Sequence, residues 1–255
     1  MNYTNFAPAA WSSLLKEYKA KTNGVVGVLF TDDVSGHQCQ DLIVPALERV
    51  GLTVYNPGLV TPGTTDFTAV ITKFLERKVD IVIVNATPLE WIPFRRQCAS
   101  LGFKPKIMGT GRCMYLPQAE VLGRELSEGI IAEILWWPNY PYKGNEWFKE
   151  TWLRIAGDLV LYQTEGIFYA NFMVAMEAVK TAGVLDRNAI NEALPKIEIE
   201  TPCGPVKFDL KTHTCGTIAT LGQFVMTSEG KWDINLIWAP EGFPVKVSPL
   251  IFPLP

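Results

Sequence analysis

Short apolar runs alternate with amphipathic stretches over the first half of the chain. The apolar runs are nearly continuous, which is typical of strands that are covered on both faces of a sheet. The predicted strands cover residues 25–30, 52–55, 79–85, 106–109 and 130–137. Between them, apolar side chains recur at helical spacing, and the predicted helices cover residues 5–21, 38–50, 67–75 and 89–101.

Strands that alternate with helices in this way predict an α/β fold with a doubly wound parallel sheet and right-handed crossovers. Ligands of such sheets bind at the carboxyl ends of the strands. The turn at residues 32–36, which follows the first strand, is therefore the first place to look for a site. The same edge is expected to carry the side chains that follow the strands, namely Ser35, Thr87, Arg112 and Trp137.

The pattern changes after Pro141. Helices are predicted for residues 147–155, 164–182 and 186–194, followed by a hairpin and by strands at 217–226 and 232–238. Prolines recur through residues 239–255, where they are incompatible with a helix or a central strand. This closing segment is expected to lie extended on the surface.

Composition narrows the class of protein. The chain has 255 residues, of which 48% are hydrophobic and 19% are charged, as in ordinary folded proteins. A formal net charge of -3 gives no basic footprint for nucleic acid, and no apolar run approaches the roughly 20 residues needed to span a bilayer. The first residues lack the pattern of a signal peptide, so the protein is either cytosolic or without its leader here.

The sequence offers no set of residues for a metal, a cofactor or a reaction. It has only two histidines, no C-x-x-C pair, no phosphate loop and no nucleophile elbow. Asp32 and Asp33 suggest the pocket of a phosphoacceptor domain, but that reading needs an aspartate at the end of a later strand, and the third strand ends in Asn85. We therefore expect no enzyme and no cofactor.

Five cysteines leave the redox compartment open. Cys39 and Cys98 fall on helix faces and are expected to behave as small buried apolar residues. Cys203 and Cys215 bracket the predicted hairpin, so they are either cross-strand partners in a disulfide or free thiols.

Several strings along the chain resemble periplasmic solute-binding proteins of branched-chain amino acid ABC transporters, the Leu/Ile/Val-binding class. The strings are residues 26–36 (VGVLFTDDVSG), 62–67 (PGTTDF), 96–102 (RQCASLG), 128–130 (EGI) and 204–209 (GPVKFD). No single string decides the matter, but their order and spacing extend over most of the chain.

The resemblance implies a type I periplasmic binding protein fold, in which two doubly wound lobes clamp a ligand. Residues 1–161 plus 217–238 resemble the second lobe, and residues 162–216 resemble the returning part of the first lobe. The amino-terminal part of the first lobe is absent, which implies a fragment or a truncated product. The helix at 164–182 is then expected to expose an apolar face, unless a partner chain or a rearrangement covers it.

The same resemblance implies the ligand contacts. Val34 and Ser35 stand in the turn that touches the ligand in the family, where many relatives have a tyrosine at the position of Ser35. Thr87 stands in the second contact loop. For both hydroxyl residues the alternative is a helix cap.

Arg112 occupies the loop in which amino acid binders of this class place an acidic residue near Gly111. A guanidinium there favours a carboxylate ligand, so an α-amino acid is in doubt. The alternative is an Arg112 that is solvated or paired with Glu133 or another surface acid. Trp136 and Trp137, after the fifth strand, either form an aromatic wall for the ligand or pack in the interior.

The resulting hypothesis is a non-enzymatic, periplasmic or extracellular solute-binding protein whose leader is absent from this chain. It would clamp a small carboxylate, an amino acid or an aromatic or organic acid, and present it to an ABC permease. No nucleic acid or membrane insertion is expected. The alternative is a sensory module that uses the same clamp to signal to a partner protein.

Overall fold

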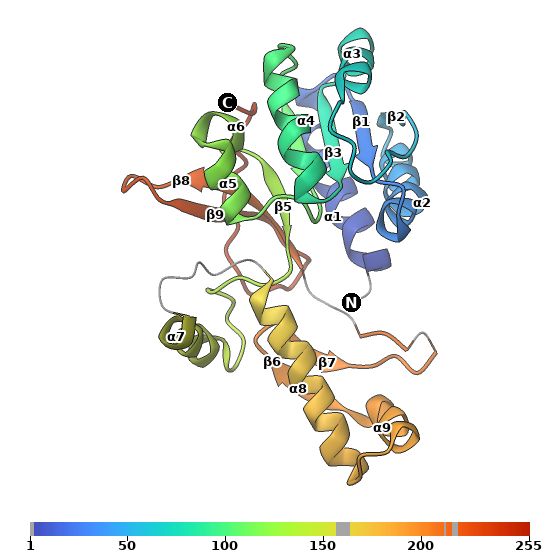
Figure 1. The fold of residues 1–255 in the computed structure, drawn as a ribbon, viewed down its shortest axis with the longest axis vertical. Helices are drawn as coiled ribbons and strands as arrows, with labels where there is room; N and C mark the ends of the chain where they lie inside the picture. Colours follow the sequence, from blue (N-terminus) through green and yellow to red (C-terminus); the bar gives the residue numbers. More distant parts are fainter. Residues whose placement is uncertain (1–2, 157–163, 212, 216–218) are drawn as a thin grey trace. The chain divides into compact units, whose positions relative to one another are not determined.

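The computed structural model describes residues 3–156, 164–211, 213–215 and 219–255 (Figure 1). The chain divides into two compact units. The sheet unit comprises Ala7–Glu133, Thr220–Ala239 and Lys246–Pro255. The helical unit comprises Met1–Phe6, Ile134–Ala219 and Pro240–Val245.

The chain passes from the sheet unit into the long segment of the helical unit at Ile134, whereas the predicted boundary between the two lobes follows residue 161. A compact unit is defined by the contacts within it, whereas the lobes are predicted from resemblance to a family. The two boundaries therefore need not coincide. The assignment of residues 1–161 plus 217–238 and of residues 162–216 to two lobes stays a prediction.

The sheet unit is built on a seven-stranded sheet with the order β2-β1-β3-β4-β5-β8-β9. Its strands are β1 (Val25–Phe30), β2 (Thr53–Tyr55), β3 (Ile81–Asn85), β4 (Ile107–Thr110), β5 (Ile131–Ile134), β8 (Thr220–Met226) and β9 (Trp232–Trp238). Strands β1 to β5 pair in parallel, and β8 and β9 form an antiparallel pair at one edge. The predicted doubly wound parallel sheet is confirmed.

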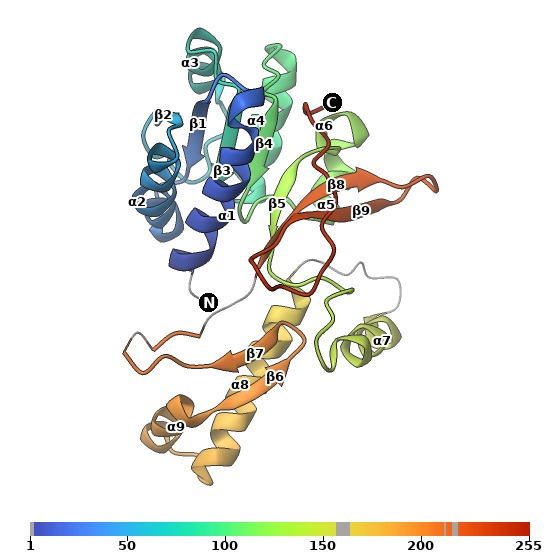
Figure 2. The ribbon, with the colours of Figure 1, turned by 180° about the vertical axis from the view of Figure 1, so that it is seen from behind.

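Six helices connect or cover these strands. They are α1 (Tyr3–Tyr18), α2 (Val34–Arg49), α3 (Thr68–Glu76), α4 (Pro88–Ser100), α5 (Leu116–Leu122) and α6 (Arg124–Ser127). Figures 1 and 2 show α1 and α4 on opposite faces of the sheet, so β1, β3 and β4 are covered on both sides. This double cover explains why those strands read as continuous apolar runs.

Trp11 of α1 anchors the core on one face of the sheet. Its side chain is fully buried, and its indole ring occupies the space where a side chain on Gly109 would begin, 2.3 Å from an added Cβ. The indole Nε1 donates a hydrogen bond of 2.8 Å to the Glu133 carboxylate at Oε1. A large aromatic ring therefore packs directly on β4 because β4 has a glycine at that position.

Three details differ from the sequence prediction. Helix α2 begins at Val34 rather than near residue 38, because Asp33 caps it and accepts a hydrogen bond from the Gly36 N-H. The fifth strand ends at Ile134, so Trp136 and Trp137 lie in the loop that follows. Helices α5 and α6 were not predicted, since seven and four residues are too few to show a helical period.

The helical unit contains three helices and a hairpin among its described residues. These are α7 (Asn145–Ala156), α8 (Glu165–Ala182), α9 (Arg187–Ala193), β6 (Glu198–Thr201) and β7 (Gly204–Lys207). On α8, Phe168, Phe172 and Met176 are exposed, so the predicted apolar surface of this helix is observed. Residues 157–163 and the start of the strand predicted at 217 lie outside the described residues.

The hairpin has a different position from the prediction. Strands β6 and β7 pair with each other, with Cys203 in the turn between them, and Cys215 forms an isolated bridge with Phe208. Cys203 and Cys215 are free thiols that line the same cavity of about 120 Å³, together with residues of α8. Burial raises the pKa of the Cys203 thiol to about 12, so this thiol is protonated and unreactive near neutral pH.

Residues 246–255 run as an extended tail along the sheet unit, in red in Figure 2. Gln223 of β8 holds the tail by its side-chain amide, which accepts a hydrogen bond from the Ile251 N-H and donates one to the Ile251 carbonyl. The Leu254 N-H donates to the Lys106 carbonyl. Across the part of the chain that the structure describes, no helix has the length and apolarity needed to cross a membrane.

Candidate functional site

A polar cluster lies at the carboxyl ends of β1, β3 and β4. Thr31 follows β1, Asn85 ends β3, and Arg112 follows β4. Because these strands are parallel neighbours, the three positions meet at one edge of the sheet, which is the edge where doubly wound sheets bind ligands. The structure thus brings Ser35 and Arg112 together, as the sequence predicts.

Arg112 is held by three side chains of the sheet unit. Its Nε donates to Asn85 Oδ1 at 3.0 Å, and its Nη2 donates to Thr31 Oγ1 at 2.8 Å. Nη2 also forms an ion pair with the Asp33 carboxylate. Among the described residues, Nη1 has no partner, and the side chain is 35% exposed. The guanidinium is therefore fixed in orientation with one pair of N-H groups still unused.

Asp33 connects the cation to the start of α2. Its Oδ1 accepts from the Gly36 N-H at 2.9 Å, and its Oδ2 accepts from the Thr31 hydroxyl at 3.0 Å as well as from Arg112. Burial raises the pKa of Asp33, but Arg112, the Gly36 N-H and the Thr31 hydroxyl outweigh it. The net effect is a pKa below the usual value, so Asp33 is ionised at neutral pH.

Ser35 completes the cluster. Its hydroxyl donates to Asn85 Oδ1 at 3.1 Å, so Asn85 accepts from both Ser35 and Arg112. The alternative that Ser35 caps α2 is wrong, because Asp33 is the cap. Gly36 lies so close to the Thr31 carbonyl that an added Cβ would stand 1.8 Å from that oxygen. This close approach draws the first turn of α2 against the end of β1.

Thr87 caps α4, which is the alternative stated for it above. Its hydroxyl group accepts a hydrogen bond from the Leu89 N-H and donates one to the Glu90 carboxylate. The same carboxylate accepts a hydrogen bond from the Thr87 N-H at 2.9 Å. Glu90 is almost fully buried and also accepts from the Gly63 N-H at 2.7 Å. Burial raises the pKa of Glu90, but these hydrogen bonds bring it below the usual value. A ligand contact for Thr87 stays a prediction.

The three apolar candidates are Val34, Trp136 and Trp137. Val34 is on the first turn of α2, and the residue is 78% exposed. Trp136 and Trp137 belong to the helical unit, where Trp136 is fully buried, contacts Phe148 edge-on and donates a hydrogen bond to Asn145 Oδ1 at 2.6 Å. Packing, the alternative stated for this pair, is thus observed for Trp136. The role of Trp136 and Trp137 as a ligand wall stays a prediction.

The sequence left the partner of Arg112 open between solvent, Glu133 and another acid. Glu133 instead accepts from Trp11, and the acid beside Arg112 is Asp33, two residues before Ser35. Sequence reasoning also left Thr31 and Asn85 out of the site. Both are buried polar residues at strand ends, and a polar residue that closes an apolar strand run is the signal that finds them.

The cluster is suited to holding an anion. Within the described residues, no group of three or more histidine, cysteine, aspartate or glutamate side chains is arranged to hold a metal ion. Arg112 offers an oriented, partly exposed pair of donors, and its positive charge is balanced by Asp33. Such a pair recognises an anion by geometry as well as by charge.

Comparison with known proteins shows the family. A family model described as "Periplasmic binding protein" matches residues 1–230, so the chain belongs to the periplasmic binding proteins. This confirms the broader part of the resemblance and agrees with the expectation of a non-enzymatic protein. The specificity for branched-chain amino acids is not part of this finding.

Solved structures agree on the fold. A solute-binding protein of an ABC transporter from R. palustris in complex with 4-hydroxybenzoate is 17% identical and has a TM-score of 0.78, over 93% of this chain and 66% of that chain. A leucine binding protein from Thermotoga maritima is 18% identical with a TM-score of 0.76, over 92% of this chain and 66% of that one. The chain therefore spans just under two thirds of the length of these structures.

A third structure extends the range of ligands among these proteins. The leucine-, isoleucine-, valine-, threonine- and alanine-binding protein from Brucella ovis, in its closed conformation, is 15% identical. It matches 94% of this chain and 65% of its own length with a TM-score of 0.74. At these identities the likeness establishes a shared fold.

Proposed function

We propose that the chain is the solute-binding part of an ABC-type importer and that it binds a small organic carboxylate through Arg112. The observation that carries this proposal is the fixed guanidinium at the carboxyl edge of the sheet, with its Nη1 edge unused among the described residues. A carboxylate oxygen that accepts from Nη1 gains a charge-assisted hydrogen bond from a donor already in place.

Several features support an aromatic or other organic acid over an α-amino acid. An amino acid brings an ammonium group that needs its own acceptors. Asp33 is the nearest acid, but it already accepts three hydrogen bonds, from Gly36, Thr31 and Arg112, out of about four positions on a carboxylate. Among proteins of the same fold, one was solved with 4-hydroxybenzoate and another with benzoate.

Ser35 is proposed to contact the ligand beside Arg112. Its hydroxyl donates to Asn85, which leaves the oxygen lone pairs of Ser35 able to accept. A hydroxyl group on an aromatic acid provides such a donor. Val34, which is exposed on the same turn, is proposed to contribute apolar contact.

The mechanism proposed is closure of a clamp without a chemical step. A second lobe closes over the ligand that Arg112 holds, and the closed state is favoured because the ligand gains contacts with both lobes only there. The closed complex is then presented to an ABC permease. The proposed location is the periplasm or the cell exterior, in agreement with the family name.

A ligand panel tests this function. The chain is titrated with benzoate, 4-hydroxybenzoate, a dicarboxylate and leucine, and binding is followed by thermal shift and by NMR of the labelled protein, which detects weak complexes. We expect the aromatic carboxylates to raise the melting temperature and to move the amide signals of Ser35 and Arg112. If leucine binds and the aromatic acids do not, the proposed ligand class is wrong.

A further inference from the structure

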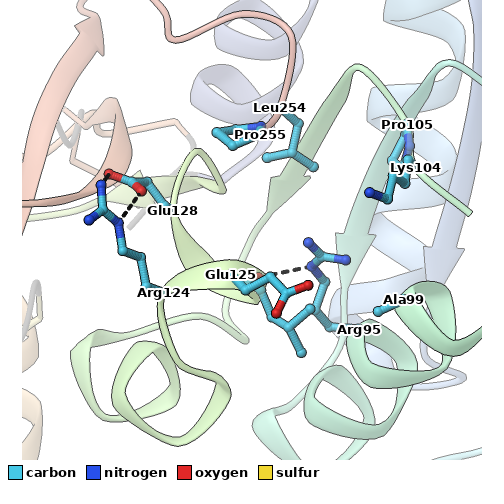
Figure 3. A pocket seen from close by; sticks show the side chains of 10 residues that line it. Arg95, Ala99, Lys104, Pro105, Arg124, Glu125, Glu128, Leu254 and Pro255 are labelled. Atoms are coloured by element: carbon cyan, nitrogen blue, oxygen red, sulfur yellow. Dashed lines mark hydrogen bonds and ion pairs between the residues drawn. The ribbon is translucent and has the colours of Figure 1, made fainter. Parts of the chain in front are cut away.

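A cavity of about 590 Å³ lies at the opposite edge of the same sheet (Figure 3). Lys104 and Pro105 come just before β4, and Arg124, Glu125 and Glu128 come just before β5, so the cavity is at the amino ends of these strands. Arg112 follows β4 at its carboxyl end. The cavity is therefore separate from the site described above, and nothing in the proposed function uses it.

Arg95 of α4 is the central feature of this cavity. Its residue surface is only 5% exposed, and its Nε donates to the Leu126 carbonyl at 2.9 Å. Within the described residues, that carbonyl is the one acceptor that its guanidinium has. Figure 3 shows the Nη nitrogens directed into the open space of the cavity. A guanidinium has five N-H donors, so four of them have no protein acceptor in the described part of the chain.

Burial without an anionic partner is costly for a cation. Burial lowers the pKa of the Arg95 guanidinium, and the Glu125 carboxylate acts in the opposite direction without cancelling the effect. Glu125 lines the cavity beside Arg95, but the two side chains do not form an ion pair within 4 Å among the described residues. The buried arginine is thus short of an acceptor.

Lys104 supplies a second cation to the same space. Its ammonium points into the cavity in Figure 3, and it has no partner among the described residues. Arg124 and Glu128 neutralise each other in a bidentate pair, with distances of 2.7 and 3.3 Å. Of the remaining lining side chains, Arg95 and Lys104 are positive and Glu125 is negative.

The rest of the lining is apolar. Leu254 and Pro255 of the tail form one wall, packed over Gly129 so closely that an added Cβ would lie 2.7 Å from Pro255. Ala99 and Pro105 form another part of the lining. The volume lies within the range of about 300–1,000 Å³ that is typical of small-molecule pockets. The cavity therefore combines charged donors with room for an organic body.

We propose that Arg95 and Lys104 form a second ligand site at the amino edge of the sheet, which binds a small organic oxyanion, either a phosphate ester or a carboxylate. The oxyanion accepts from the Nη groups of Arg95 and from the Lys104 ammonium, and its organic part lies against Leu254 and Pro255. Glu125 opposes the anion and limits its affinity.

Isothermal titration of the whole chain at fixed ionic strength tests this site, with inorganic phosphate, phenyl phosphate and benzoate as probes. Phenyl phosphate is expected to bind more tightly than inorganic phosphate, because it also covers the apolar wall. Lys104→Met is expected to weaken binding of the preferred probe by about tenfold, the effect of one charged hydrogen bond. Glu125→Gln is expected to strengthen it, since it removes the opposing charge.

Lys106→Met is the matched control. It removes the same charge two residues away, where the ammonium pairs with Asp80 outside the cavity, and it is expected to leave the affinity unchanged. If benzoate binds, its affinity falls in Lys104→Met and neither phosphate binds, the site is assigned to carboxylates. The proposal is overturned if no probe binds, or if binding is the same in Lys104→Met and Glu125→Gln as in the wild type. Both variants change surface side chains, so neither result depends on Arg95→Met being able to fold.

Discussion

The two edges of the sheet each hold an arginine, but they use it differently. At the carboxyl edge, Arg112 is fixed by Asn85, Thr31 and Asp33, and its charge is balanced before any ligand arrives. At the amino edge, Arg95 is more deeply buried and bonds to one backbone carbonyl. The number of N-H donors that already have protein acceptors determines how many remain for a ligand.

This difference has a consequence for recognition. A guanidinium held by three side chains presents its remaining donors in one direction, which favours selectivity for ligand shape. A guanidinium with four unused donors gains more from any anion that reaches it, because the anion also relieves the cost of burial. We expect the carboxyl edge to select its ligand and the amino edge to accept several oxyanions.

The largest effect is expected from the carboxylate that orders the loops at the carboxyl edge. Glu90→Ala removes the buried carboxylate that accepts hydrogen bonds from the Gly63 and Thr87 N-H groups, so both of these part-buried bonds are lost. The free energy of unfolding should fall by about 2–4 kcal/mol in chemical denaturation. Glu76→Ala, which breaks an exposed pair with Lys73, is the control and should change it by less than about 1 kcal/mol. Equal effects would show that Glu90 does not hold these loops.

The second effect concerns the close approach of α2 to β1. In Gly36→Ala, the new methyl group collides with the Thr31 carbonyl, so the first turn of α2 must shift. We expect a loss of about 1–3 kcal/mol in the free energy of unfolding, together with changed NMR signals for Ser35 and Arg112. If the signals of the amino-edge residues Arg95 and Lys104 stay in place, the two edges respond independently. A neutral Gly36→Ala would contradict the packing described here.

The third effect depends on pH. The pKa of Asp33 is lower in the folded state than in the unfolded chain, so the stability that this carboxylate contributes is present above about pH 4 and is lost as the pH falls through the folded pKa. Denaturation between pH 7 and pH 3 should therefore show a smaller loss of stability for Asp33→Asn than for the wild type. Glu48→Gln on the exposed face of α2 serves as the control. If the stability of Asp33→Asn falls as steeply between pH 7 and pH 3 as that of the wild type, Asp33 does not contribute to this pH dependence.

Much of the fold follows from the sequence because it depends on local pattern. The strands β1, β3 and β4 are buried on both faces, so their positions are visible as apolar runs. The start of α2 was misplaced because its cap is Asp33, and the preceding Asp32 offers the same chemistry in the sequence. Only the backbone geometry decides which aspartate reaches the Gly36 N-H.

The site could be predicted only in part. Parallel strands bring Ser35 and Arg112 to one edge whatever their side chains do, and this placement was correct. The partners of Arg112 depend on rotamers and on the depth of each loop, which a pattern does not contain. Arg95 shows the same limit, because an arginine beside a second arginine in a helix reads as surface, yet it is buried.

The most direct test of the central claim, that Arg112 binds the carboxylate of the ligand, is a cycle that changes both partners. Binding of benzoate and of benzamide, its neutral analogue, is measured by NMR titration for the wild type and for Arg112→Met. The account predicts that Arg112→Met weakens benzoate by about 1.5–3 kcal/mol more than benzamide. If both ligands lose the same binding energy, or neither does, the carboxylate does not bind at Arg112 and the proposed function is contradicted.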